Sequence, residues 1–158
     1  MNRNTTIGAP VIAGNPICQN GSTNISIAAT GDGLTYLWKK EGQPITSGSV
    51  SGITTNTLVI SNALTSDAGV YTCTVTGSCG SPQTSINAVI TVNPATAITT
   101  QPSNYIKCEG DEVILTVEAT GASLTYQWKK GGAAGVNVSD GLQPSGAVIT
   151  GATTAQMK

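Results

Sequence analysis

The side chains that most often carry chemistry are scarce in this sequence, which has no histidine and only 9% charged residues. Histidine is the commonest general base, the usual orienting group of a nucleophile triad and the commonest metal ligand. Its absence argues against hydrolytic and metal-dependent catalysis. We therefore predict no catalytic residue and no cofactor, and we do not expect the chain to be an enzyme.

One acidic cluster, Glu109-Gly110-Asp111-Glu112, has a composition that could hold a calcium ion weakly through oxygen ligands. The segment at the matching position of the repeat described below, Gln19-Asn20-Gly21-Ser22, is uncharged. We therefore interpret the cluster as a solvated turn and predict no metal site. The glycine-rich stretch 131–135 lacks the Lys-Ser/Thr pair of a phosphate-binding loop, and we interpret it as a loop.

The charge balance limits the classes of partner. The net charge is -1, the pI is about 5.1, and no run of Lys or Arg offers a surface for phosphates, so we expect no nucleic-acid partner. No apolar stretch approaches the roughly 20 residues of a membrane span, so we expect no membrane insertion. Residues 1–6 lack the apolar segment of a secretory signal, and we expect any such signal to lie outside this sequence.

An internal repeat defines the organisation of the chain. Residues of the first half recur 90 positions later: Cys18 as Cys108, Gly31 as Gly121, and Tyr36-Leu37-Trp38-Lys39-Lys40 as Tyr126-Gln127-Trp128-Lys129-Lys130. The match resumes at an offset of 99, where Gly52-Ile53-Thr54-Thr55 aligns with Gly151-Ala152-Thr153-Thr154. The second copy therefore carries an insertion of nine residues within 131–146. We predict two domains, 1–93 and 94–158.

Alternating apolar residues in the first copy predict β-strands with one buried face. The inward positions of five segments are Ile25, Ile27 and Ala29; Tyr36 and Trp38; Leu58 and Ile60; Tyr71, Cys73 and Val75; and Ile86, Ala88, Ile90 and Val92. Turn-forming clusters such as Gly31-Asp32-Gly33 separate these segments at the spacing of an antiparallel sandwich. The fold class is therefore predicted to be all-β.

These residues resemble the strands of an immunoglobulin domain. In Asp67-Ala68-Gly69-Val70-Tyr71-Thr72-Cys73, the resemblance implies that Tyr71 forms the corner between strands E and F and that Cys73 points into the core. Trp38 would be the core tryptophan of strand C. The Thr- and Gly-rich sequence, with one Cys before strand B and another after strand F, is similar to tandem immunoglobulin-like repeats of large secreted and cell-surface proteins of bacteria.

The chain departs from the animal family at the position of the strand-B cysteine, which is Ile27 in the first copy and Val117 in the second. The usual bridge from strand B to strand F is therefore missing. We predict that Cys73 is a buried free thiol that packs as a small hydrophobic residue. The predicted structural core comprises Ile27, Trp38, Tyr71 and Cys73 of the first copy and Val117 and Trp128 of the second.

The remaining cysteines have a further meaning, because the bacterial repeats that the chain resembles often carry both Cys18 and Cys79. Cys18 falls at the A–B turn and Cys79 at the F–G turn, which lie at opposite ends of an immunoglobulin topology. They are too far apart for a disulfide, whose Cα atoms lie roughly 5.5 Å apart. We predict instead a disulfide between successive modules, in which Cys18 or its counterpart Cys108 meets the F–G cysteine of the following repeat. This implies an oxidising, extracellular setting.

The second copy is shorter than the first. Met157 aligns with Leu58, so we expect a partial domain with strands A to D and the start of E. The absent strands would cover Trp128, and leaving its roughly 200 Å² in water forfeits on the order of 5 kcal/mol. Two explanations stay open: a piece of a longer multi-repeat protein, or completion by strands of another chain. We predict that the region is mobile unless Trp128 is covered.

The resemblance implies a structural or adhesive role, in which stacked sandwiches act as spacer or assembly modules of an extracellular bacterial surface protein or fibre. The expected partners are neighbouring modules or other copies of the chain. The alternative is a ligand- or carbohydrate-binding accessory module that uses the loops Ser47 to Thr55 or Gly131 to Gly151. Sugar-binding faces need exposed aromatic side chains, whereas aromatic residues are 4% of the sequence and only Tyr105 is not assigned to the core.

Overall fold

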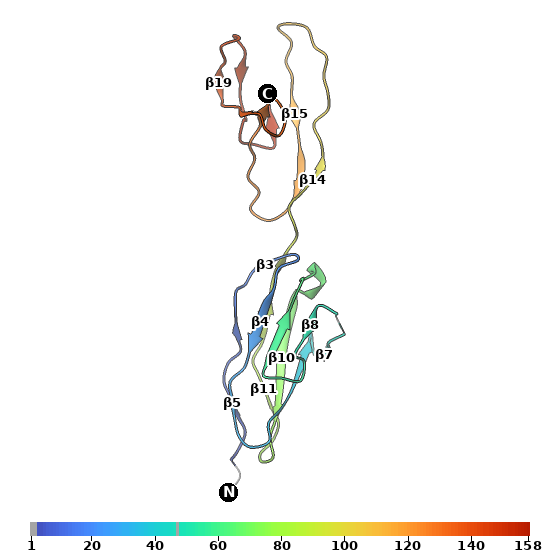
Figure 1. The fold of residues 1–158 in the computed structure, drawn as a ribbon, viewed down its shortest axis with the longest axis vertical. Helices are drawn as coiled ribbons and strands as arrows, with labels where there is room; N and C mark the ends of the chain where they lie inside the picture. Colours follow the sequence, from blue (N-terminus) through green and yellow to red (C-terminus); the bar gives the residue numbers. More distant parts are fainter. Residues whose placement is uncertain (1–2, 47) are drawn as a thin grey trace. The chain divides into compact units, whose positions relative to one another are not determined.

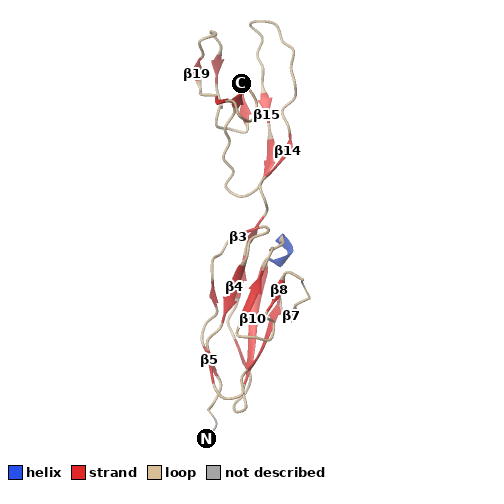
Figure 2. Ribbon diagram, in the orientation of Figure 1, coloured by secondary structure: helices blue, strands red, loops and turns tan. Residues whose placement is uncertain are grey.

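The computed structural model describes residues 3–46 and 48–158, so Met1, Asn2 and the loop residue Ser47 lie outside the described residues. The chain divides into two compact units, one ending at Pro94 and the other running from Ala95 to Lys158. The described residues form β-strands and one 3-10 helix, η1 (Thr65–Asp67) (Figures 1 and 2). None of them belongs to a helix with the length and apolar character needed to cross a bilayer.

Two antiparallel sheets build the first unit. The first sheet has the order β2–β4–β9–β8, formed by β2 (Val11–Ile12), β4 (Thr23–Ser26), β9 (Thr57–Ile60) and β8 (Val50–Ser51). The second has the order β11–β10–β6–β7, with β12 also paired to β10: β11 (Gln83–Thr84), β10 (Gly69–Thr76), β6 (Thr35–Lys40), β7 (Gln43–Pro44) and β12 (Ala88–Ile90). A short antiparallel pair joins β1 (Thr6–Ile7) to β5 (Ala29–Thr30).

Side chains of both sheets meet in one buried core. Burial alternates with a period of two along β4, β9 and β10, as expected for strands with one face on the core. Trp38 lies opposite Cys73 in the pairing of β6 with β10. The side chains without solvent exposure in this core include Ile25, Trp38, Leu58, Ile60, Tyr71, Cys73 and Val75.

The sequence prediction is wrong at Ile86, which is 70% exposed instead of facing inward. The strand opposite β10 contains one extra residue: Tyr71 pairs with Ala88, whereas Thr74 pairs with Thr84. Three steps along β10 thus correspond to four along its partner. This β-bulge shifts the side-chain alternation by one residue, so Ser85 takes the inward position that the alternation assigned to Ile86.

One strand pair of the first unit departs from the predicted antiparallel sandwich. β3 (Ile17–Cys18) lies parallel to β13 (Val92–Asn93). The backbone N–H of Ile17 donates to the Thr91 carbonyl at 3.0 Å, and that of Gln19 donates to the Asn93 carbonyl at 2.7 Å. Both ends of the Asn15 side-chain amide hydrogen-bond to the same edge at 2.9 Å. The N-terminal segment therefore pairs with the first sheet at β2 and with the last strand at β3.

In the described part of the chain, the second unit contains four antiparallel pairs. They are β14 (Ala97–Thr100) with β16 (Glu118–Thr120), β15 (Leu115–Thr116) with β21 (Gln156–Met157), β17 (Lys129–Lys130) with β18 (Val136–Asn137), and β19 (Gly141–Leu142) with β20 (Val148–Ile149). The first three correspond to β1–β5, β4–β9 and β6–β7 of the first unit. The fourth pair is a hairpin that begins inside the insertion, while 131–135 forms bends and a turn.

The second unit also departs from the sequence prediction in the segment expected to be strand C. Tyr126 and Trp128 belong to no strand, and only Lys129–Lys130 of this segment pair with a neighbour. Residues 113–119, which include the predicted core residue Val117, alternate in burial: the odd-numbered residues are partly buried and the even-numbered ones are exposed. The equivalent of the first unit's inner face is therefore present, but it is less buried.

Candidate functional site

Trp38 is held in the first unit by two hydrogen bonds to one turn. Its indole Nε1–H donates to the Thr55 carbonyl at 2.8 Å, and its backbone N–H donates to the Ile53 carbonyl at 2.9 Å. The turn itself is closed by Thr55, whose hydroxyl donates to the Gly52 and Thr57 carbonyls. A buried indole therefore has its polar atom satisfied, as the energetics of burial require.

Tyr71 forms the corner that the sequence resemblance implied. Its hydroxyl donates to the Asp67 carbonyl at 2.7 Å, and the Asp67 carboxylate accepts from Ser49 Oγ at 2.7 Å and from the Leu64 backbone N–H at 2.8 Å. Asp67 is 1% exposed, so these bonds replace its lost hydration. Burial, followed by the charges of Asp67 and Glu41, raises the pKa of Tyr71 to about 12.

Cys73 is buried beside the bulge and forms no disulfide in this structure. Its backbone N–H donates to Ser85 Oγ at 3.0 Å, and its carbonyl accepts from the Ser85 N–H at 2.9 Å. Burial raises the pKa of the Cys73 thiol to about 11, and a hydrogen bond from the Leu37 backbone opposes this shift. The thiol is therefore protonated at neutral pH, and the thiolate needed for nucleophilic or metal-binding chemistry is not formed.

Cys18 and Cys79 lie at opposite ends of the first unit. Cys18 is next to Asn93, where the chain leaves the unit, whereas the Cys79 carbonyl accepts hydrogen bonds from the N–H and hydroxyl of Thr5, where the chain enters. The eight residues of β10 separate these ends, which corresponds to roughly 25 Å of strand. Cys18 and Cys108 are exposed and Cys79 is partly exposed. The disulfide between modules stays a prediction.

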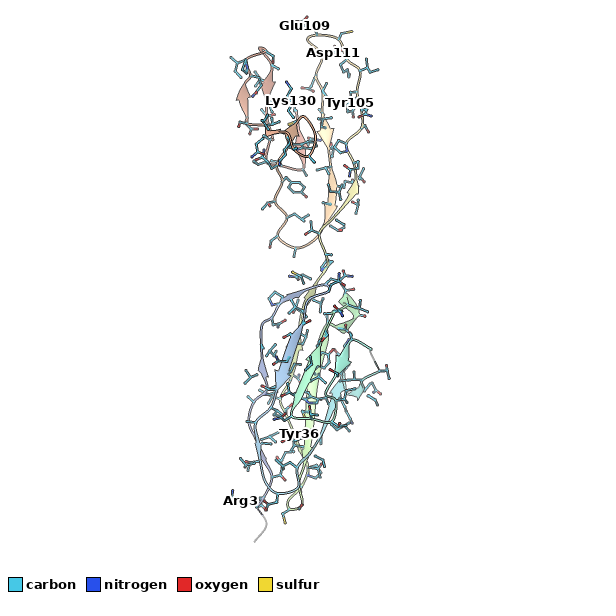
Figure 3. All side chains as sticks on the ribbon, in the orientation of Figure 1. Arg3, Tyr36, Tyr105, Glu109, Asp111 and Lys130 are labelled. Carbon is cyan, nitrogen blue, oxygen red and sulfur yellow. The ribbon has the colours of Figure 1, made fainter. Side chains whose placement is uncertain are left out.

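The acidic cluster Glu109–Glu112 forms a turn of the second unit. The Asp111 N–H donates to the Cys108 carbonyl and the Cys108 N–H donates to the Asp111 carboxylate, both at 3.2 Å. Glu112 forms an ion pair with Lys158. Figure 3 shows Glu109 and Asp111 at the tip of this loop. Among the described residues, no three acidic or cysteine side chains lie close enough to hold a metal ion.

The aromatic side chains considered for ligand stacking are mostly engaged in the two cores. Tyr36 and Tyr126 are partly buried, and Tyr105, on the same loop as the acidic turn (Figure 3), is 51% exposed. Of the two loops considered for ligand binding, 131–151 contains the β19–β20 hairpin, and 47–55 contains β8, apart from Ser47 outside the described residues.

The second unit repeats the tryptophan turn of the first. The Trp128 indole donates to the Thr154 carbonyl at 2.8 Å, and its backbone N–H donates to the Ala152 carbonyl at 2.9 Å. Thr154 closes the turn through bonds to the Gly151 and Gln156 carbonyls, as Thr55 does in the first unit. The position of the indole is therefore set by local contacts that both units share.

An open cavity of about 370 Å³ lies over the inner side of the second unit. Its apolar lining comprises Ile98 and Pro102 together with five residues that we call the open inner face: Val117, Ala119, Leu124, Tyr126 and Trp128. All five are partly buried. Two of their counterparts in the first unit, Ile27 and Trp38, are buried, whereas the other three, Ala29, Leu34 and Tyr36, are partly buried there as well. The sequence predicts Val117 and Trp128 as core residues, but it does not predict this cavity.

Comparison with known families assigns the fold of the first unit. Residues 10–76 match the family model of the immunoglobulin domain, so an immunoglobulin-like domain is recognised there. The chain is 34% identical over 110 residues to contactin of Drosophila melanogaster, covering 67% of this chain and 8% of that protein. It is 31% identical over 109 residues to cell adhesion molecule DSCAML1 of Mus musculus, covering 68% and 5%. The chain thus spans less than a tenth of either relative.

Solved structures agree with an all-β immunoglobulin-like fold. The N-terminal eight immunoglobulin domains of Down syndrome cell adhesion molecule match with a TM-score of 0.64 at 18% identity, covering 89% of this chain and 20% of that one. An I-band fragment of titin matches with a TM-score of 0.60 at 15% identity, covering 99% and 55%. The insect immune protein hemolin matches with a TM-score of 0.51 at 20% identity, covering 95% and 39%. Identities this low show the fold alone.

Proposed function

We propose that the chain is a structural or adhesive module of an extracellular protein, in which consecutive immunoglobulin-like units act as spacers or assembly elements. The observation that carries this proposal is the repetition of one scaffold in two successive units, including the tryptophan hydrogen bond of 2.8 Å. Each additional unit of this kind makes the protein longer, and the row of units presents an extended surface to partners. The proposed domains are residues 1–93 and the partial unit 94–158.

The similar proteins support an adhesive role and an extracellular location. The mouse relative is a cell adhesion molecule, and the hemolin structure is described with implications for homophilic adhesion. A further solved structure that the chain matches is that of extracellular domains 3–5 of Drosophila OTK. By analogy with these proteins, we propose that the partners are neighbouring immunoglobulin-like modules or other copies of the chain. We propose no nucleic-acid partner, since the net charge is -1, and no membrane insertion, since no apolar stretch of the sequence approaches the roughly 20 residues of a membrane span.

We propose a secreted or surface protein or fibre of a bacterium as the setting. The support is the resemblance of the Thr- and Gly-rich sequence, with Cys18 and Cys79, to repeats of such proteins. Ile27, buried at the position of the animal strand-B cysteine, is consistent with this setting. The matched relatives are animal proteins, but the chain covers only 5–8% of their length, so they support the type of module and not the organism.

We propose no catalytic activity and no cofactor for the described units. The sequence has no histidine, and the buried thiol of Cys73 is kept protonated by a pKa of about 11. The carboxylate of Asp67 is occupied by Ser49 and Leu64. These two side chains of the first unit therefore have structural roles, which supports a non-catalytic function.

We also propose that modules of this type are joined by disulfides, with Cys18 or Cys108 of one module bonded to the Cys79-type residue of the next. The support is the exposure of these thiols and the position of Cys18 and Cys79 at opposite ends of the first unit. In each bridge two thiols lose two protons and two electrons to a low-molecular-weight disulfide, which is reduced to two thiols. Peptide mapping of a longer oxidised array without reductant would identify the pairing.

The adhesive proposal is tested by coating beads with the chain and measuring their aggregation. We expect beads coated with the folded chain to aggregate, and beads coated with a Trp38→Ala variant to stay dispersed because the first unit loses its core. The same preparations are applied to a glycan array. Dispersed beads together with glycan binding would contradict the adhesive role and favour the carbohydrate-binding alternative.

A further inference from the structure

Asn20 and Gly21 are the one Asn-Gly pair of the sequence, and they lie in a tight turn that directly follows β3. The Gly21 N–H donates to the Cys18 carbonyl at 2.9 Å and closes the turn. Asn20 is exposed and has a φ of 67° at the third position of the turn. Asparagine tolerates this left-handed conformation better than most residues do.

The packing of the turn requires glycine as the second residue of the pair. A Cβ added at Gly21 would lie 2.8 Å from the Cys18 carbonyl oxygen, so a larger residue would displace the turn. Buried Ala63 holds the turn from the other side. The Asn20 N–H donates to the Ala63 carbonyl at 2.8 Å, and the Ala63 N–H donates to the Gly21 carbonyl at 2.9 Å. The fold therefore places a carboxamide directly before an unhindered backbone nitrogen.

This pair of residues has the groups needed to modify itself without an enzyme. The Gly21 nitrogen, after losing its proton to a base, bonds to Asn20 Cγ. The Cγ–Nδ2 bond then breaks, and ammonia leaves a cyclic imide. Water opens either C–N bond of the imide and gives aspartate or isoaspartate, so the sum of the steps consumes water and releases ammonia. Asparagine is counted among the thermolabile residues.

The folded turn opposes this reaction. The Gly21 nitrogen keeps its proton and its place while the N–H is donated to Cys18, so ring closure requires the turn to open first. The pairing of β3 with β13 and the two bonds of the Asn15 side chain, both at 2.9 Å, hold this end of the first unit closed. Because such openings are local fluctuations of the native state, the rate of modification follows how often the turn opens.

Other residues of the chain combine only some of these properties. Asn62 is also exposed and has a φ of 50°, but alanine follows it instead of glycine. Asp32 and Asp140 are each followed by glycine. Their carboxylates accept backbone N–H groups at 2.7 Å, and an ionised carboxylate is a poor electrophile. Asn20 therefore differs from them in joining a carboxamide to a following glycine.

The second unit has the same turn without the carboxamide. The Asp111 N–H donates to the Cys108 carbonyl at 3.2 Å, as Gly21 donates to Cys18 in the first unit. Gly110 takes the place of Asn20 and has a φ of 91°. The turn thus accepts glycine at this position, which provides a control substitution that suits the backbone.

We infer that Asn20 is a self-modification site, which converts to aspartate or isoaspartate when its turn opens. In isoaspartate the backbone runs through Cβ and Cγ and is longer by one methylene, so the two hydrogen bonds to Ala63 do not both re-form. The modified turn therefore keeps an irreversible record that this end of the first unit has opened. The inference goes beyond the adhesive role and does not depend on it.

The reaction is followed on the full chain at mildly alkaline pH in water enriched in heavy oxygen, and peptide mapping by mass spectrometry locates the label. We expect the label at residue 20 and none at Asn62. The rate should be at least about tenfold higher in denaturant than in the folded chain. Asn20→Gly should keep the fold and abolish the label at this turn.

A variant of the folded chain tests whether opening of the turn limits the rate. Asn15→Ala removes the side-chain bonds to Val89 and Thr91 and should speed the reaction at Asn20 by about fivefold. Asn24→Ala, the matched change at an exposed position of β4, should leave the rate within about twofold.

Amide exchange of the purified isoaspartate chain tests the consequence of the modification. The Ala63 N–H should lose protection, because its acceptor in the turn is displaced. The inference would be overturned by equal rates in the folded and the denatured chain, by labelling of Asn62 as fast as that of Asn20, or by absence of label at residue 20. An unchanged rate in Asn15→Ala, or unchanged protection of Ala63 after modification, would equally contradict it.

Discussion

Trp38 and Trp128 have equivalent hydrogen-bond partners but different exposure, which separates two contributions to the immunoglobulin-like fold. The turn from Gly52 to Thr55 and its counterpart at 151–154 orient both indoles in the same way. In the first unit Trp38 lies opposite Cys73 of β10 within a full sheet and has no exposed surface, whereas Trp128 belongs to no strand and is partly exposed. The comparison teaches that local polar contacts place the tryptophan, whereas strands distant in the sequence supply its burial.

The largest expected effect on stability comes from removing the two tryptophans, one at a time. Trp38→Ala should destabilise the first unit by about 3–5 kcal/mol because it leaves a large cavity. Trp128→Ala should cost about 1–2 kcal/mol, since less apolar surface is removed from a partly exposed site. Denaturant unfolding followed by residue-resolved amide exchange measures the two costs separately. Equal costs would show that Trp128 is as well buried in solution as Trp38.

The second prediction concerns the stability of the first unit at alkaline pH, which depends on its buried acidic groups Tyr71 and Cys73. The pKa values of Cys73 and Tyr71 rise to about 11 and about 12 on folding, from ordinary values of 9.0 and 10.0. The folded state therefore keeps protons that the unfolded chain releases. Stability should be full below about pH 9 and fall as the pH rises toward about 12, with Cys73 contributing on the order of 2–3 kcal/mol.

Chemical unfolding between pH 8 and about 11.5 follows this loss. Cys73→Ala removes one of the two titrations and should make the decline shallower, even though it lowers stability at neutral pH. Cys18→Ala, at an exposed thiol, is the matched control and should leave the slope unchanged. The prediction fails if the Cys73→Ala and Cys18→Ala variants lose stability with the same dependence on pH.

The third prediction uses the bulge, which has no counterpart in the described second unit. Ser85→Ala should cost the first unit about 1–2 kcal/mol, because the buried Cys73 N–H loses its acceptor at 3.0 Å. Ile86→Ala, beside it but 70% exposed, should change stability by less than about 0.5 kcal/mol. Thermal unfolding of both variants gives the comparison, and a larger effect at Ile86 would contradict the observed register.

The smallest expected effect tests what the two units share. Thr55→Val and Thr154→Val each remove a hydroxyl that closes the tryptophan turn. We expect similar costs of about 0.5–1 kcal/mol in the two units, because the lost bonds are local and solvent-exposed. Amide exchange of the turn residues measures each cost. A much larger cost in one unit would mean that the turns are supported differently.

The sequence was sufficient to predict the all-β class and the core of the first unit because both depend on period-two burial. Ile86 could not be placed, since one extra residue in a strand leaves no local signal until its partner's register is known. The parallel course of β3 likewise depends on its partner, β13. In the second unit, Tyr126 and Trp128 have strand-like alternation but lack the neighbouring strand that would complete a ladder.

The candidate site was harder to predict than the fold for a related reason. Val117 and Trp128 follow from the repeat. The packing of Thr96 and Leu124 around Gly121, which matches that of Thr5 and Leu34 around Gly31, instead brings together residues from two segments. Thr96 is offset by 91 from Thr5, whereas Gly121 and Leu124 are offset by 90 from Gly31 and Leu34. A one-residue difference in the first strand hides the correspondence in the sequence, and only the shared packing reveals it.

The parallel pairing of β3 with β13 has a consequence for the first unit under mechanical load. The chain enters β3 from one end of the unit and leaves β13 at the other, so tension pulls these two strands in opposite directions along their length. The hydrogen bonds from Ile17 to Thr91 and from Gln19 to Asn93 are then sheared together instead of opening one after another. The β3–β13 pair thus links the point where force enters the first unit to the point where force leaves it, and resists extension of the unit.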